Sequence, residues 1–306
     1  MSEIKFKEIS IKVSNIDKLF FPGDGITKGD VIEYYQKIAK FMLPHIIERP
    51  LMVQCFPDGI NGRNYYQQNA LDYFPTWIKR IKVNKKNGGF VEHVICDSAA
   101  TLVYLTDQGC FTPHVWLSQV SSLNNPDRMI FDLDPANNGF ENVRFAARVL
   151  RELLEQELQL ETFVMTTGSR GLHIVAPLDG RQEFDEVRSF ARNIAEILVQ
   201  RYPGQLTTEM RKEKRKGKLF VDTNRNAFGQ TAIAPYAIRP KPGAPVAAPI
   251  EWGELSDKAL NAQHYNIKNI FDRLEQKKDI WRNINKKANS LLKSKQQLKR
   301  HYADTK

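Results

Sequence analysis

The spacing of apolar residues along the chain predicts several amphipathic helices. From Thr27 to Met42 the apolar side chains recur at helical spacing, Thr27 can cap the helix, and Asp30 falls in its first turn. The same spacing predicts helices over residues 140–158 and 184–202, and two more over about 256–275 and 279–300. Each of these segments has an apolar face to bury.

Short apolar runs between the helices predict strands. They cover Met129–Phe131, Thr162–Thr167, Leu172–Pro177, Lys218–Asp222 and Thr231–Ile238. Four prolines between residues 240 and 249 then interrupt regular structure. Helices that alternate with short strands and hairpins indicate an α/β or α+β core between about residues 120 and 245.

Composition and cysteine usage narrow the class of protein. The chain has 306 residues, of which 42% are hydrophobic and 26% charged, which is typical of a globular protein with one large domain or two. Its three cysteines form no C-x-x-C pair, which argues against a secreted disulfide scaffold and a structural zinc site. No apolar run is long enough for a membrane span and no signal-peptide core is present. We therefore expect a soluble cytoplasmic protein that has no membrane partner.

The positive charge is concentrated in three places. Residues 276–306 contain ten Lys or Arg and two Asp, a net charge of +8, whereas the whole chain carries +10. Two further basic clusters lie within residues 79–86 and 211–218. Clustered positive charge on a nearly neutral body favours a polyanionic partner such as nucleic acid, although solvated lysine faces are the commoner reason for such runs.

The segment around Asp132 and Asp134 carries the strongest local signal for chemistry. Both carboxylates leave the same face of a predicted buried strand, with Cα atoms about 6.6 Å apart. Paired carboxylates at a strand end repel each other unless a cation lies between them, and Mg²⁺ or Mn²⁺ prefers such oxygen ligands. A turn with two capping aspartates is the alternative. Asp222, at the end of the strand Lys218–Asp222, can supply a third carboxylate, as a two-metal nucleotidyltransferase requires.

The turn from Thr167 to Gly171 has the residues of a phosphate-binding loop. Its glycines and hydroxyl residues, Ser169 among them, allow backbone N–H groups to converge on a phosphate, and Arg170 adds a guanidinium fork. His173 lies on the strand that follows and can reach the same cleft. Two other users of a D-x-D pair fit less well: a phosphatase would need Thr or Val where Ala136 stands, and a glycosyltransferase leaves the basic clusters unexplained.

Five segments in order resemble the polymerase domain of bacterial ATP-dependent DNA ligase D, in the archaeo-eukaryotic primase superfamily. The resemblance covers about residues 13–251. It implies an α+β, primase-like catalytic core of mixed and antiparallel sheets flanked by helices. The segments are Asn15–Pro22, Thr27–Asp30, Pro126–Pro135, Gly168–His173 and Thr231–Arg239.

The resemblance implies roles for individual residues. Asp132, Asp134 and Asp222 match the catalytic, metal-binding carboxylates of the family. The positions that contact the nucleotide are matched by Thr167, Arg170, His173, Arg215, Arg225 and Arg239, with Ser169 in the same turn. Asn15, Lys18 and Lys28 match a pocket for the 5′-phosphate of the downstream DNA strand. Tyr65 and Tyr66 match an aromatic pair on which template bases stack.

The chain departs from the family pattern near its DNA-contacting residues. Gln54, Cys55 and Gln68 stand where the family usually has basic residues, and the basic tail lies beyond the matched region. We expect residues 1–275 to form the polymerase domain, with a DNA-end-binding part to about 120 and a catalytic core over about 121–250, and residues 276–306 to form a basic helix or tail. Because a ligase Lys-x-Asp-Gly motif is absent, we also expect a free-standing protein that works with a separate ATP-dependent ligase and an end-bridging protein.

The resulting hypothesis is a two-metal polymerase, using Mn²⁺ or Mg²⁺ and nucleoside triphosphates. It would extend primers, fill gaps with a downstream 5′-phosphate and add ribonucleotides at DNA ends in non-homologous end joining, in association with the nucleoid. The alternatives are a primase that starts chains without a primer, and a DNA-end-binding module without polymerase activity. A phosphatase, which would release phosphate without a template, is the weakest of the four.

Overall fold

The computed structural model describes residues 2–85, 88–136 and 139–302. Within these ranges the chain divides into two units by its internal contacts. The first unit comprises residues 1–116, 231–248 and 265–282, and the second comprises residues 117–230, 249–264 and 283–306. No helix among the described residues is long and apolar enough to cross a membrane.

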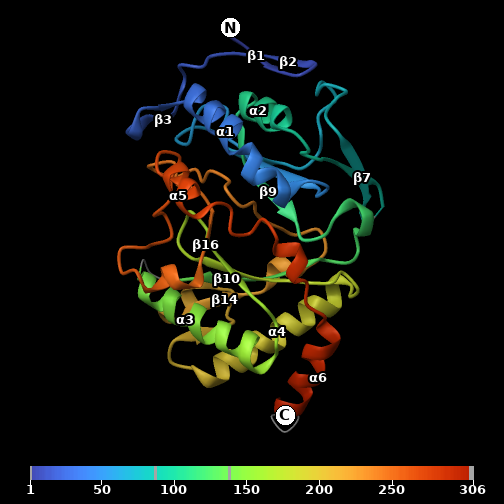
Figure 1. Cartoon of the computed structure of the whole chain (residues 1–306), viewed down its shortest axis with the longest axis vertical. Helices are drawn as coiled ribbons and strands as arrows, with labels where there is room; N and C mark the ends of the chain where they lie inside the picture. The colour runs from blue at the N-terminus through green and yellow to red at the C-terminus, as the bar shows by residue number, and fades with distance from the viewer. Residues whose placement is uncertain (1, 86–87, 137–138, 303–306) are drawn as a thin grey trace. The chain divides into compact units, whose positions relative to one another are not determined.

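Helix α1 is the central helix of the first unit (Figure 1). It spans Lys28–Ile46 and begins at the predicted cap residue Thr27, which forms a capping box with Asp30: each side chain bonds the other's backbone N–H. Ten of its side chains are buried, so the predicted apolar face is confirmed. The other helices of this unit are α2 (Ala99–Asp107) and α5 (Ile270–Lys277).

A four-stranded antiparallel sheet completes the core of the first unit. Its order is β15 (Thr231–Ile233), β9 (Cys110–Trp116), β5 (Leu51–Cys55) and β6 (Tyr65–Gln67). Three two-stranded pairs accompany it: β1 (Ser2–Phe6) with β2 (Ile9–Val13), β3 (Leu19–Phe21) with β4 (Ile26–Thr27), and β7 (Arg80–Asn84) with β8 (Phe90–Val94).

A disulfide joins Cys55 and Cys110 across β5 and β9, where the two residues are register partners. No motif in the sequence predicts this pairing. The two cysteines are 55 positions apart, and only the strand register brings them opposite each other. Cys96, the third cysteine, is buried as a free thiol.

The second unit is built on a six-stranded sheet. Its order is β13 (Leu206–Thr207), β14 (Leu219–Asp222), β10 (Arg128–Asp134), β12 (Leu172–Pro177), β11 (Phe163–Thr166) and β16 (Ala248–Ile250). Most neighbouring strands are antiparallel, and β13 with β14 is a parallel pair. The expected mixed, mainly antiparallel α+β core is therefore present.

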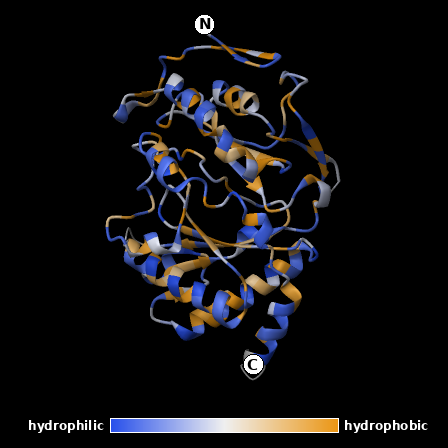
Figure 2. Cartoon of the chain, in the orientation of Figure 1, coloured by the Kyte–Doolittle hydropathy of each residue, from blue (hydrophilic) through white to orange (hydrophobic). Residues whose placement is uncertain are grey.

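Helices α3 (Phe140–Glu152) and α4 (Phe184–Arg201) cover one face of this sheet (Figure 1). Both helices carry hydrophobic and hydrophilic residues in alternation along their length, as amphipathic helices do (Figure 2). Met129, Phe131 and Leu133 of β10 are fully buried and share one strand face. Asp132 and Asp134 consequently lie on the opposite face of the sheet.

The two helices predicted near the C-terminus are wrong in extent. Residues 257–269 contain no α-helix; instead, the side chains of Asp257, Asn261 and Asn266 each accept a bond from the backbone N–H two residues ahead. Such side chains offer the backbone an alternative to helical bonds. The second predicted helix is shortened to α6 (Leu291–Tyr302), because the Asn289 side chain exchanges hydrogen bonds with the Glu161 backbone and donates to Pro177 O.

Candidate active site and DNA-end pocket

Three predicted site residues lie side by side on adjacent strands of the second unit. Asp132 of β10 is the register partner of Asp222 on β14 and of His173 on β12. Directly opposed residues of antiparallel strands point to the same face of a sheet. The strand pairing therefore brings together two carboxylates and an imidazole that are widely separated in the sequence.

The environment of Asp222 reflects the neighbouring carboxylate. Burial raises the pKa of Asp222, and the charge of Asp132 raises it further, while the Asn224 N–H and Arg225 oppose the shift. The Asn224 backbone N–H donates to Asp222 Oδ1 at 2.7 Å. A cation would be stabilising beside a buried carboxylate that lies next to a second one.

Arginines surround the carboxylates. Asp134 accepts from Arg170 Nη2 at 2.9 Å and from Arg215 Nη1 at 3.0 Å, while Arg225 Nε lies 3.7 Å from Asp132 Oδ2. Arg215 is held by the carbonyl oxygens of Glu209 and Met210 as well, and its guanidinium lies 4.3 Å from the centre of the Phe220 ring. These guanidinium groups give the site the donors that a triphosphate would need.

The carboxylates are thus not arranged as a ready three-ligand metal site. Among the described residues, no group of three His, Cys, Asp or Glu side chains is clustered for a metal. Asp134 forms ion pairs with Arg170 and Arg215. Asp132 and Asp222 lie next to each other on adjacent strands, on the same face of the sheet. The Asp132–Asp222 pair has the oxygen donors and the mutual repulsion that suit a divalent cation.

His173 carries a buried polar atom that no described residue satisfies. Its ring is buried, with Nε2 3.6 Å from Asp132 Oδ1, and Nδ1 has no hydrogen-bond partner among the described residues. A buried nitrogen left in this way is costly unless a ligand or water satisfies it. Contact of His173 with a nucleotide stays a prediction.

The turn before His173 is fixed by Thr167 and two glycines. Thr167 Oγ1 donates to Gly171 O at 3.0 Å and accepts from the backbone N–H groups of Ser169 and Gly171 at 3.3 Å. Gly168 has a φ of +64°, and a Cβ on Gly171 would lie 1.8 Å from the Leu133 carbonyl oxygen. Only glycine fits there, so the turn stays against the strand that carries the aspartates.

Gln263 also contacts this turn, and sequence reasoning missed it. Its Nε2 donates to the Ser169 carbonyl oxygen at 2.7 Å, from a segment that was expected to be helical. No motif marks this residue, so its contact could not be predicted. Arg239, the remaining predicted nucleotide residue, belongs to the first unit, where its backbone N–H donates to Pro245 O at 2.7 Å.

The three residues of the predicted 5′-phosphate pocket are adjacent in the first unit. The Lys18 N–H donates to Asn15 O at 3.0 Å, and the Lys28 N–H donates to Lys18 O at 2.8 Å. Asn15 adopts a φ of +50°, which asparagine tolerates better than most residues. The turn 15–18 therefore lies against the first residue of α1.

The two lysines of this pocket differ in environment. The Lys18 ammonium lies 2.6 Å from Asp58 Oδ1, and these side chains are 38% and 63% exposed. The Lys28 ammonium lies 2.7 Å from Asp107 Oδ1, with side chains only 5% and 9% exposed. The Ser14 N–H donates to the same Asp107 oxygen at 2.9 Å. Neither aspartate was singled out from the sequence.

Lys28→Ala is expected to destabilise the protein by about 3–5 kcal/mol, because it would leave the Asp107 charge buried without its partner. Lys18→Ala, which removes an exposed pair, should cost less than about 1 kcal/mol and is the matched control. Urea denaturation measures both free energies of unfolding. Equal values for the two variants would contradict the assignment of Lys28–Asp107 as a buried structural pair. Direct contact of Lys28 with a phosphate stays a prediction.

The predicted aromatic pair is divided between two sheet faces. Tyr65 and Tyr66 are consecutive on β6 and pair with Cys55 and Gln54, so their side chains point in opposite directions. Tyr66 is 58% exposed, whereas Tyr65 is partly buried with Arg63 near its ring. Stacking of template bases stays a prediction, and Tyr66 is the better placed of the two.

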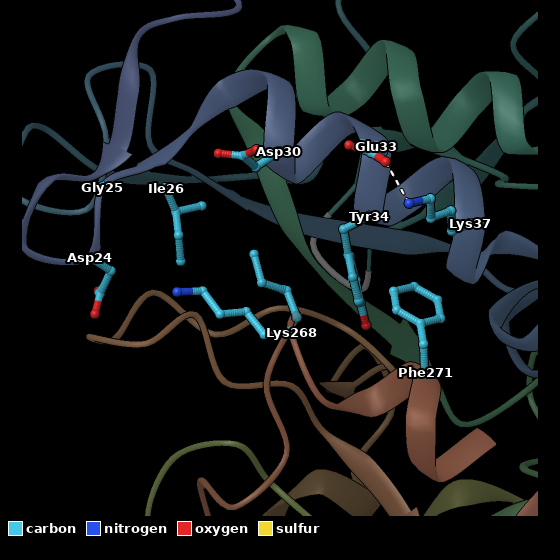
Figure 3. A pocket seen from close by; sticks show the side chains of 10 residues that line it. Asp24, Gly25, Ile26, Asp30, Glu33, Tyr34, Lys37, Lys268 and Phe271 are labelled. Atoms are coloured by element: carbon cyan, nitrogen blue, oxygen red, sulfur yellow. Dashed lines mark ion pairs between the residues drawn. The ribbon is translucent and has the colours of Figure 1, made fainter. Parts of the chain in front are cut away.

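A cavity of about 380 Å³ lies elsewhere in the first unit, between the start of α1 and the segment that leads into α5 (Figure 3). Its lining includes none of the predicted site residues. The lining residues are Asp24, Gly25, Ile26, Asp30, Glu33, Tyr34, Lys37, Ile267, Lys268 and Phe271.

Comparison with known proteins identifies relatives over most of the chain. The family model described as LigD, primase-polymerase domain, matches residues 27–281. The multifunctional non-homologous end joining DNA repair protein LigD of Mycobacterium tuberculosis is 35% identical over 269 residues, which cover 85% of this chain and 35% of that protein. The bifunctional LigD of Bacillus subtilis is 28% identical over 267 residues, which cover 87% of this chain and 42% of that protein. The chain thus spans about a third of the length of the curated relatives it matches first.

The fold comparison agrees with the sequence comparison. The polymerase domain from Mycobacterium tuberculosis ligase D, solved in complex with DNA, superposes with a TM-score of 0.84 and 31% identity. The match covers 91% of this chain and 99% of that domain. This chain therefore belongs to the LigD primase-polymerase domain family, which confirms the resemblance, the α+β fold and the nucleotidyltransferase class expected from its sequence.

Proposed function

We propose that this chain is a template-directed polymerase that extends primers and fills gaps at DNA ends during non-homologous end joining. The observation that carries the proposal is the row Asp222, Asp132 and His173 across three adjacent strands, with Arg170, Arg215 and Arg225 around it. Carboxylates beside several guanidinium groups suit a triphosphate and its metal ions better than either group alone. The names of the similar proteins, which refer to non-homologous end joining and to a complex with DNA, support the same proposal.

The chain's own residues would hold the nucleotide in place. Arg170 and Arg215 now bind Asp134, and an arriving triphosphate would compete with this carboxylate for their N–H donors. His173 Nδ1, buried without a protein partner among the described residues, can donate to a nucleotide oxygen. The Thr167–Gly171 turn supports these groups from the adjacent strand end.

Asp132 and Asp222 would hold the metal ions, with Asp134 at the edge of the same site. When bound, two Mn²⁺ or Mg²⁺ ions supply a lowered pKa for the primer 3′-hydroxyl and neutralise negative charge on the α-phosphate. The positions of Asp132 and Asp222 would determine where the metal ions bind, because strand pairing holds both carboxylates in place. A binding module without activity would not need two carboxyl groups held so close together, so this geometry favours an enzyme.

The predicted 5′-phosphate pocket suggests the substrate, a DNA gap or end with a phosphorylated downstream strand. Asn15 and Lys18 form a turn on which an ammonium is exposed, as recognition of a 5′-phosphate on the downstream strand would require. A separate ATP-dependent ligase activity and an end-bridging protein would act on the same ends. Association with the nucleoid follows from this proposal.

Primer extension on a gapped duplex tests the proposed function. Substrates with a 5′-phosphate or a 5′-hydroxyl on the downstream strand are compared, with ribo- and deoxyribonucleotides in Mn²⁺ and in Mg²⁺. We expect template-dictated addition that is faster with the 5′-phosphate, and Lys18→Ala should remove this advantage, about tenfold for a charge-assisted contact. If Lys18→Ala slows extension of both substrates equally, Lys18 is a general DNA contact and not part of a phosphate pocket.

A further inference from the structure

The exposed Lys18–Asp58 pair points to a competition inside the proposed 5′-phosphate pocket. The ammonium that would meet the phosphate already contacts a carboxylate, at 2.6 Å. An incoming phosphate must therefore displace Asp58 or bind beside it. We propose that Asp58 is a specificity-determining residue: the 5′-phosphate displaces it from Lys18, and its charge sets how strongly a phosphorylated end is preferred. This inference rests on the proposed recognition of a 5′-phosphate.

Backbone contacts hold Asp58 beside Lys18. The Ile60 N–H donates to Phe20 O at 2.9 Å, which ties the turn after β5 to strand β3. Gly59 has a φ of +77°, and a Cβ there would lie 2.8 Å from the Leu19 carbonyl oxygen. The close approach requires glycine, so the position of Asp58 next to Lys18 is built into the fold.

The difference in exposure explains why Asp58, and not Asp107, would be the residue displaced. The Asp58 side chain is 63% exposed, and an exposed ion pair contributes little because solvent screens it. Asp107 is almost fully buried and also accepts from the Ser14 N–H, so separating it from Lys28 would be costly. Lys18 is thus the cation that can exchange partners, while Lys28 is fixed.

The charges favour the exchange. A phosphate monoester carries between one and two negative charges at neutral pH and has three acceptor oxygens, whereas Asp58 carries one charge. A 5′-hydroxyl carries no charge, so it would not displace Asp58 from Lys18. The carboxylate therefore keeps Lys18 occupied until a phosphorylated end arrives, and its own charge opposes that arrival.

The test is DNA binding by the full chain without nucleotide, measured on gapped duplexes with a 5′-phosphate or a 5′-hydroxyl. The quantity compared is the affinity for the 5′-phosphate duplex divided by the affinity for the 5′-hydroxyl duplex. Asp58→Asn keeps the shape of the side chain and removes its charge, so the ratio should rise about two- to fivefold, the range expected for one exposed pair. The rise should shrink at high salt.

Glu33→Gln is the matched control. Glu33 lies in the same unit, forms an exposed ion pair with Lys37 at 2.5 Å (Figure 3), and its substitution changes the net charge of the chain by the same amount. It should leave the ratio unchanged. A similar rise in Glu33→Gln would show a general effect of charge and would overturn the inference.

The Lys18→Ala background separates displacement from simple repulsion. If Asp58 acts by occupying Lys18, Asp58→Asn should raise the ratio less in Lys18→Ala than in the wild type. Equal rises in both backgrounds overturn the inference, as does a wild-type ratio above one that Asp58→Asn fails to raise. A ratio near one in both the wild type and Asp58→Asn overturns phosphate recognition in the proposed function as well.

Discussion

Asp132→Asn is expected to abolish nucleotide addition, with a loss of at least about a thousandfold in extension rate. Asp132 is the centre of the row formed with Asp222 and His173, and asparagine keeps its shape but removes the charge that would hold a cation. The measurement is single-nucleotide extension of a primed template with saturating nucleotide. DNA affinity, measured separately, should change little because the carboxylate does not attract DNA.

Asp185→Asn is the control for this substitution. Asp185 lies in the first turn of α4, is exposed, and belongs to the same unit. The Asp185→Asn variant should extend primers at the wild-type rate. Extension by Asp132→Asn at a similar rate would rule out the proposed role of the carboxylate row.

Arg170→Ala should raise the KM for the nucleotide by about tenfold to over a hundredfold. A charge-assisted bond to phosphate is worth about 1.5–3 kcal/mol, and alanine removes all of its donors. Arg170 is partly exposed and reaches Asp134 Oδ1 at 2.9 Å, so it is available to an arriving triphosphate. Steady-state kinetics at varied nucleotide concentration measure the effect.

Arg181→Ala is the control for Arg170→Ala. Arg181 is an exposed arginine of the same unit that is also near an aspartate, with its Nε 3.6 Å from Asp179 Oδ2. Its replacement should leave the KM unchanged. An unaltered KM in Arg170→Ala, together with weaker DNA binding, would assign the turn to the template and not to the nucleotide.

The row of Asp222, Asp132 and His173 could be predicted because its carboxylates follow short, strongly apolar strands. Met129–Phe131 and Lys218–Asp222 each lead into an aspartate, and strands of one sheet bring such ends together. The spacing of Asp132 and Asp134 also predicted their common face. It could not predict that Asp134 would bind Arg170 and Arg215, since ion pairs between distant segments depend on side-chain packing.

Side-chain contacts between polar residues that are far apart in the sequence could not be predicted. Asp58 and Asp107 have no motif, and their pairing with Lys18 and Lys28 depends on how separate segments pack in the first unit. The same holds for Gln263 and for the Cys55–Cys110 pair. Near the C-terminus, apolar spacing predicted a helix over about residues 256–275, and its first part forms turns in which the Asp257 and Asn261 side chains accept backbone N–H bonds.

Template-dictated choice of nucleotide is the most direct test of polymerase activity in this chain. The purified chain is given a gapped duplex with a 5′-phosphate, one nucleoside triphosphate at a time, and each of the four template bases in turn. If the proposed function holds, the complementary nucleotide is added fastest opposite every base, addition requires Mn²⁺ or Mg²⁺, and Asp132→Asn adds none. Addition that ignores the template base, or that persists in Asp132→Asn, would contradict it.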